Sequence, residues 1–193
     1  MSRRRTSAGE ASLLAWGEAL RVETVRRTRL GRRIALVGAG VFFVLASSVF
    51  SPTPRLVWNA SASAPIGLYW VQPGTDIDPG DMVIARLPDG IRQLAARRRY
   101  LPSNVPLVKR VVAVAGDEVC ALGKEVFLNG RPIAGRRTVD GAGRPMPAWS
   151  GCVRLRGRQL FLLIDAPASF DGRYFGVTDG ADVIGKARLL WAR

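Results

Sequence analysis

The uncharged run IALVGAGVFFVLASSVF at residues 34–50 constrains this chain more than any other feature, because it holds 17 consecutive residues without a charge. As a helix rising about 1.5 Å per residue, it would span roughly 25 Å, slightly less than a hydrocarbon core of roughly 30 Å. Flanking residues and the arginines that precede the run can cover this deficit. The run therefore predicts one membrane-spanning helix near the N-terminus.

The charge around this run predicts its orientation. Residues 1–33 contain nine Arg and three Glu, a net charge of +6. Because cytoplasmic flanks of membrane helices carry an excess of Lys and Arg, we expect a cytoplasmic basic segment at 1–33, an anchor at 34–52 and an external domain at 53–193. The alternatives are a buried core helix and a cleaved signal peptide, whose apolar stretch usually has about 7 to 15 residues.

The external segment has the pattern of a mostly β domain. Short apolar runs are separated by Gly, Pro and Asp, and Asn-Gly at 129–130 is a hairpin signal. The predicted strands are 82–87, 107–114, 159–164 and 183–191. No long helix is expected there. The predicted fold is therefore a single β domain preceded by one transmembrane helix.

The sequence contains no histidine, which limits the chemistry that a serine could perform. A Ser-His-Asp triad is excluded, so a serine needs a neutral lysine as its base, or a carboxylate acts on water. Burial must lower the pKa of such a lysine from about 10.4 toward roughly 7 to 8. Two cysteines without histidine predict no metal site, and we expect no cofactor.

Lys109 is the best candidate among the three lysines. Strand alternation puts it on one face with Leu107 and Val111, where burial is plausible. Lys124 follows a glycine and is expected in an exposed turn, whereas Lys186 also lies in a strand-like run. The alternative for Lys109, favoured on periodicity alone, is a side chain that reaches water from the mouth of a strand.

Cys120 and Cys152 both fall in the predicted external domain. An oxidising compartment would let them form a disulfide, and two small buried thiols are the alternative.

Three motifs resemble those of one enzyme family. KRVVAVAGDEV at 109–119 resembles the lysine-bearing box of the type I signal peptidases, which are membrane-anchored serine proteases with a Ser-Lys dyad. SFDGRYFG at 169–176 resembles their C-terminal box, and GDMVIARL at 80–87 resembles the strand between. The resemblance runs from about Asn59 to Gly176 in the order of the family, and implies a signal-peptidase-like β domain.

The resemblance also assigns roles within WNASASAPIGLYW, residues 58–70. It implies that Ser63 is the nucleophile, that Lys109 is its base and that the Ser61 hydroxyl helps to bind the oxyanion. An alanine follows Ser63 where the wider family has methionine, and the proline comes one residue earlier. The alternative for this stretch is a polar linker behind the anchor.

The C-terminal box implies that Ser169, Asp171 and Arg173 support the dyad. Two departures from the family are visible. The Gly-Asp-Asn opening is replaced by LID at 163–165, and Gly172 stands where the family has a second serine. The alternative for Asp171 and Arg173 is an ordinary surface ion pair.

The spacing Ser-x-Pro-x-Gly-Leu-Tyr, the single anchor and the cysteine pair look more like the TraF-type branch of the family. Peptidases of this branch serve conjugative transfer and mature a pilin precursor, in some systems joining its ends into a ring. The implied partners are a membrane-tethered pilin precursor or other preprotein and the lipid bilayer, without nucleic acid. The implied location is the bacterial inner membrane, with the catalytic domain in the periplasm.

Three other functions are compatible with part of the pattern. One is a general signal peptidase for secreted precursors, and another is a self-cleaving repressor, which would carry a DNA-binding domain where this chain has an apolar span. The third is a non-catalytic, membrane-anchored component of a transfer apparatus. Reactivity of Ser63 with an acylating probe would separate an enzyme from such a component. A nucleic-acid binder is also suggested by RRR at 97–99, although a solvated face is the favoured alternative for these arginines.

Overall fold

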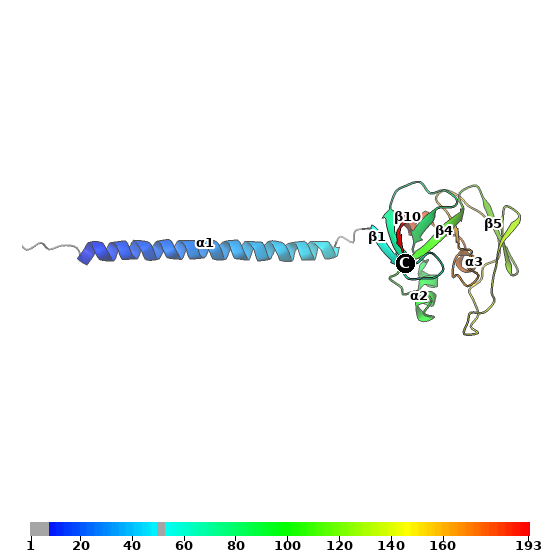
Figure 1. Cartoon of the computed structure of the whole chain (residues 1–193), viewed down its shortest axis with the longest axis horizontal. Helices are drawn as coiled ribbons and strands as arrows, with labels where there is room; N and C mark the ends of the chain where they lie inside the picture. Colours follow the sequence, from blue (N-terminus) through cyan, green and yellow to red (C-terminus); the bar gives the residue numbers. More distant parts are fainter. Residues whose placement is uncertain (1–7, 50–52) are drawn as a thin grey trace, which may run out of the picture. The chain divides into compact units, whose positions relative to one another are not determined.

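The computed structural model describes residues 8–49 and 53–193, which belong to two separate compact units. The first unit contains one helix, α1 (Ala8–Val49; Figure 1). Within it, Arg27–Ser47 is long and apolar enough to cross a membrane, and none of this stretch is buried. Such a helix is either a transmembrane anchor or a signal sequence. Residues 50–52 of the predicted anchor lie outside the described residues.

The second unit is built on a larger antiparallel sheet, in which the described strands follow the order β1-β2-β10-β3-β4-β9. Their bounds are β1 Leu56–Asn59, β2 Gly67–Gln72, β3 Met82–Ala85, β4 Leu107–Ala113, β9 Phe161–Leu163 and β10 Val183–Ala192. The C-terminal strand β10 therefore lies between two early strands, β2 and β3. This order brings the regions around residues 60, 109 and 170 into one domain.

A smaller antiparallel sheet has the strand order β7-β6-β5-β8 among the described residues (β5 is labelled in Figure 1). Its strands are β5 Glu118–Leu122, β6 Glu125–Leu128, β7 Arg131–Gly135 and β8 Gly151–Arg154. Asn129 and Gly130 have positive φ values of 49° and 78°, as the predicted hairpin requires. Cys120 and Cys152 face each other in β5 and β8 and form a disulfide. The prediction of a mostly β domain is confirmed.

Helix α2 (Asp89–Arg97) is the largest difference from the predicted elements of this domain. It begins directly after Pro88, whose fixed φ suits a helix start, and Asp89 lies in the first turn. Among its residues Ala95 is the buried one, and it packs with Leu87 and Leu107. Ile91, Leu94 and Ala95 have helical spacing, but the helix is shorter than the window of about 11 to 18 residues over which that period is recognised. Two one-turn elements follow later, α3 (Gly172–Phe175) and a 3-10 turn at Gly180–Asp182.

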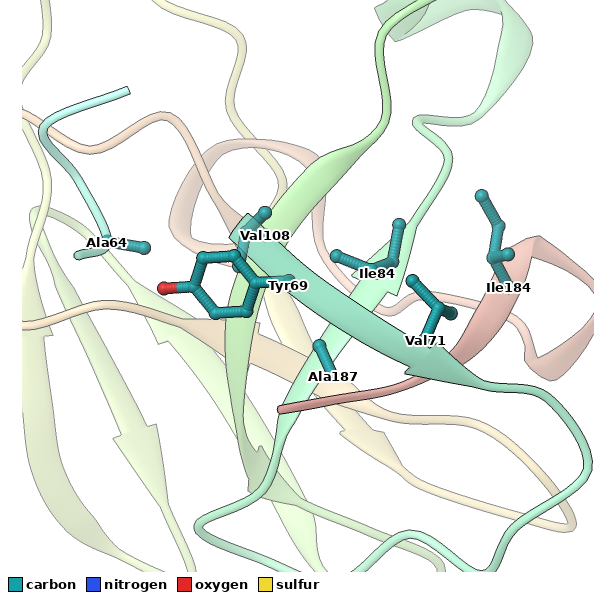
Figure 2. Packing of buried hydrophobic residues seen from close by; sticks show 7 residues of the cluster. All are labelled: Ala64, Tyr69, Val71, Ile84, Val108, Ile184 and Ala187. Carbon is teal, nitrogen blue, oxygen red and sulfur yellow. The ribbon is translucent and has the colours of Figure 1, made fainter. Parts of the chain in front are cut away.

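One core cluster joins the larger sheet to the serine-containing loop after β1. Figure 2 shows Ala64 of this loop beside Tyr69, with Val108 and Ile84 from neighbouring strands in the same cluster. Ala64 is 6% exposed and Tyr69 is 1% exposed. Burial of a large apolar side chain contributes about 1.5 to 3 kcal/mol, so this packing holds the loop against the sheet.

Candidate active site

Strand β4 carries Lys109 into the interior. The side chain is 2% exposed, and its chain neighbours Leu107 and Val108 are buried as well, whereas Arg110 points to solvent. β4 pairs with β3 on one side and β9 on the other, so both edges of the strand are covered. A lysine at this position cannot reach water from a strand mouth. The alternative raised for Lys109 from its periodicity is therefore wrong.

The loop between β1 and β2 brings two serines to this lysine. Lys109 Nζ lies 3.0 Å from Ser63 Oγ, and Ser63 Oγ lies 2.9 Å from Ser61 Oγ. The backbone N–H of Ser63 donates to Ser61 Oγ at 3.3 Å. Ser61 is exposed and Ser63 is half-buried, so a substrate can approach both hydroxyls. The loop is therefore part of a polar cluster around Lys109.

The C-terminal box completes the cluster. Lys109 Nζ donates to Ser169 Oγ at 2.7 Å, and Ser169 is buried. Asp171 and Arg173 form an ion pair at 2.8 Å in which both side chains are almost fully buried. The alternative of a surface ion pair is therefore wrong. A pair at this depth is stable only when its remaining hydrogen-bonding groups are satisfied.

The hydrogen bonds around Asp171 meet this requirement. Its carboxylate accepts from the backbone N–H of Arg173 at 3.2 Å, capping α3, and from the N–H of Ile164 at 3.2 Å. A terminal nitrogen of Arg173 donates to the Ile164 carbonyl at 2.6 Å. The pair thus ties the box to the end of β9, which fixes the backbone that carries Ser169.

Gly172 has a steric reason to differ from the family pattern. A Cβ built at this position would lie 2.7 Å from the Leu162 carbonyl oxygen and 3.0 Å from the Phe161 ring. A serine does not fit this backbone. The loss of the second serine of the box is thus coupled to the close packing of α3 against β9.

Burial sets the acidity of the central amine. It lowers the pKa of Lys109 from 10.5 to about 8, with the Asp171 carboxylate acting in the opposite direction and the Arg173 guanidinium reinforcing the decrease. Near pH 8 about half of the molecules therefore hold a neutral amine. A neutral amine 3.0 Å from a hydroxyl is within proton-transfer reach of it.

The other lysines lie elsewhere, as does one possible metal-binding cluster. Lys124 is exposed, and Lys186 forms an ion pair with Asp81 at 2.6 Å, which raises the pKa of Lys186. Ligand atoms of Glu118, Cys120 and Cys152 lie within 4.8 Å of one another. Because the two sulfur atoms are bonded to each other, this group has no thiolate to offer a metal.

Sequence reasoning missed one polar residue of this region, Asn59. It is 6% exposed at the end of β1 and its side chain bonds to the serine loop. The available signal was its position directly before a loop of small residues, because asparagine side chains commonly bond to backbone groups two residues ahead.

Residues 27–192 match the model of the family described as signal peptidase, peptidase S26. The chain belongs to this family. A plasmid transfer protein TraF of Escherichia coli is 31% identical over 179 residues, covering 86% of this chain and 99% of the relative. A probable conjugal transfer protein TraF of Sinorhizobium fredii is 31% identical over 186 residues, covering 86% and 94%.

A solved structure also matches. The chain is similar to a signal peptidase I from Enterococcus faecalis at 18% identity, with a TM-score of 0.34 over 58% of this chain and 97% of the other. The expected relationship to the signal peptidases, with TraF proteins among the relatives, is confirmed by the family match and the two sequence relatives.

Proposed function

We propose that this chain is a membrane-anchored serine endopeptidase that uses a Ser63–Lys109 dyad to process a pilin precursor during conjugative transfer. The observation that carries the proposal is the contact of 3.0 Å between a half-buried serine hydroxyl and the amine of a buried lysine. Membership of the signal peptidase family and the names of the TraF relatives support the reaction and the setting.

The mechanism begins with neutral Lys109 taking the hydroxyl proton of Ser63 while Oγ attacks the carbonyl carbon of the scissile bond. The carbonyl oxygen becomes an oxyanion, and the Ser63 N–H and Ser61 hydroxyl donate hydrogen bonds to it. Both donors now bond within the loop, at 3.3 Å and 2.9 Å, and must exchange those partners for the oxyanion. Removal of one such donor typically costs about 10²- to 10³-fold in rate.

The second half of the reaction releases the two products. The tetrahedral adduct collapses as the C–N bond breaks, and protonated Lys109 gives its proton to the leaving amine. Lys109, neutral again, then removes a proton from water, whose oxygen attacks the carbonyl carbon of the Ser63 ester. The bond between that carbon and Ser63 Oγ breaks, Oγ takes the proton back from Lys109, and a linear product is released. If the N-terminal amine of the substrate attacks instead, the product is a ring.

We propose that the apolar stretch of α1 anchors the chain in the bacterial inner membrane, with the catalytic unit in the periplasm. The leader before the apolar run carries the excess of arginine expected of a cytoplasmic segment. The Cys120–Cys152 disulfide suits an oxidising compartment. Ser63 follows the run by 13 residues, a chain length of about 45 Å at most, which favours substrates cut near the membrane surface.

The test is processing of a pilin precursor by the full chain, followed by mass measurement of the products. Ser63→Ala and Lys109→Ala each abolish cleavage, Ser61→Ala slows it about 10²- to 10³-fold, and Ser103→Ala, an exposed serine, leaves it unchanged. Full activity of the Lys109 variant would rule out the dyad. Equal cleavage of unrelated secreted precursors would instead indicate a general signal peptidase.

A further inference from the structure

The side chain of Asn59 is bonded on all sides to the loop that carries the two serines. Its two amide N–H groups face three carbonyl oxygens, those of Ser61 at 3.0 Å, Ala64 at 3.1 Å and Pro65 at 3.0 Å, so that one N–H is shared between two acceptors. Its amide oxygen accepts from the backbone N–H of Ser61 at 3.0 Å. One buried side chain therefore contacts both ends of the loop.

We infer that Asn59 is a positioning residue for the dyad and acts through Ser61. This inference rests on the proposed function. Asn59 holds the residue that carries the oxyanion hydroxyl by both its N–H and its C=O. Because Ser61 Oγ lies 2.9 Å from Ser63 Oγ, a displacement of Ser61 moves the hydroxyl away from both the nucleophile and the developing oxyanion.

The bonding pattern requires an amide. Only asparagine offers two N–H groups and a carbonyl oxygen on a side chain this short, and aspartate would bring a carboxylate against three carbonyl oxygens. Burial increases the cost of any bond that is lost, because water cannot replace the missing partner. The position therefore selects asparagine for its chemistry and not only for its size.

Tyr69 supports the same loop from the neighbouring strand. Its hydroxyl donates to the Pro65 carbonyl at 2.9 Å, and Figure 2 shows that hydroxyl directed toward the side of the cluster where Ala64 lies. β1 and β2 pair so that Asn59 faces Gly67. The loop is thus fastened by one polar side chain from each of the two strands it connects.

The experiment measures the rate at which a serine-directed acylating probe labels Ser63 in the detergent-solubilised full chain, from pH 6 to 9. We expect Asn59→Ala to reduce the limiting rate about 10²-fold, similar to the loss of an oxyanion donor. The pH of the half-maximal rate stays near 8, because Lys109 remains buried. Asn104→Ala, at an exposed asparagine, serves as the control and keeps the wild-type rate.

A double-mutant cycle separates positioning from a general loss of stability. If Asn59 acts through Ser61, then adding Ser61→Ala to Asn59→Ala lowers the rate less than threefold further. Independent, multiplicative losses would overturn the inference, as would a wild-type rate for folded Asn59→Ala. Should Asn59→Ala fail to fold, Tyr69→Phe removes a single bond to the loop, and a rate about fivefold below wild type is expected.

The same probe distinguishes this inference from the proposed function. Labelling of wild type but not of Ser63→Ala supports the dyad, and the Asn59 variants then test the positioning role. Absence of labelling in wild type, or persistent labelling of Ser63→Ala, overturns the proposed function and the inference together. A wild-type rate in folded Asn59→Ala, with normal labelling of the wild type, overturns the inference alone.

Discussion

Lys109 and Lys186 occupy the same row of one sheet and differ in almost every property that matters for chemistry. Lys186 in β10 pairs with Val83 in β3, and Val83 pairs with Lys109 in β4. The Lys186 side chain is 31% exposed and contacts the Asp81 carboxylate, whereas Lys109 is buried and contacts the hydroxyls of two serines. Their pKa values shift in opposite directions.

Two factors differ between these lysines, burial and the nature of the direct partner, and burial is the larger cause of the lowered pKa of Lys109. A carboxylate in contact stabilises the ammonium form, as Asp81 does for Lys186. Near Lys109 the carboxylate of Asp171 is bonded to Arg173, whose positive charge opposes it.

Replacing Lys109 by methionine should abolish cleavage, a loss of at least about 10³-fold, because no base then remains beside Ser63. Folding should survive, since a pKa lowered from 10.5 to about 8 means that burying the ammonium form costs about 3 kcal/mol. Thermal unfolding of the Lys109→Met variant at pH 6 tests whether it folds. Lys186→Met is the matched control and should retain cleavage. Loss of cleavage in this control would show that replacing any lysine in these aligned strands disturbs the site, so that the loss in the Lys109 variant could not be assigned to a missing base.

Replacing Asp171 by alanine should lower the free energy of unfolding by about 3 to 5 kcal/mol, because it leaves the Arg173 charge buried without its partner. Denaturant titration of the solubilised chain measures the loss. Asp89→Ala breaks an exposed ion pair with Arg92 and should have little effect. An equal decrease in the free energy of unfolding of the two variants would mean that the buried ion pair stabilises the fold no more than an exposed one does.

The cleavage rate should rise about tenfold per pH unit below pH 8 and level off above it. A base acts in its neutral form, and the neutral fraction of Lys109 increases with pH up to its pKa of about 8. Rate measurements from pH 6 to 9 test the profile. Lys109→Arg should be inactive throughout, because a guanidinium is not deprotonated in this range. A flat wild-type profile would contradict the role of Lys109.

Replacing Lys186 by alanine should have the smallest effect. Its ion pair with Asp81 is accessible to solvent, and such pairs contribute little to stability. We expect the melting temperature to change by about 2 °C or less, and the pH profile of cleavage to keep its midpoint. A shift of the midpoint of this pH profile would mean that the charge of Lys186 affects the pKa of Lys109.

The features of the site that depend on local sequence were predictable. Strand alternation placed Lys109 on one face with Leu107 and Val111, although periodicity alone favoured a side chain that reaches water. The Asn-Gly signal predicted the hairpin between β6 and β7. Features that depend on distant contacts were not. The depth of Asp171 results from packing of α3 against β9, and the bonds of Asn59 form only when the loop folds back onto β1. Helix α2 was missed because it is too short for its helical period to be recognised.

Ser61, Ser63, Lys109 and Ser169 form a chain of hydrogen bonds. Which group donates and which accepts in this chain depends on the charge of Lys109. A neutral amine has one lone pair, which can accept the Ser63 hydrogen while Ser61 donates to Ser63 and an N–H of Lys109 donates to Ser169. An ammonium group has no lone pair, so Ser63 must turn its hydrogen away and toward Ser61. Each protonation of Lys109 would therefore reverse the hydroxyl next to it. Under the proposed mechanism, the ammonium form is inactive because it has no lone pair for the Ser63 proton, and passing between the two forms needs only hydrogen atoms to move.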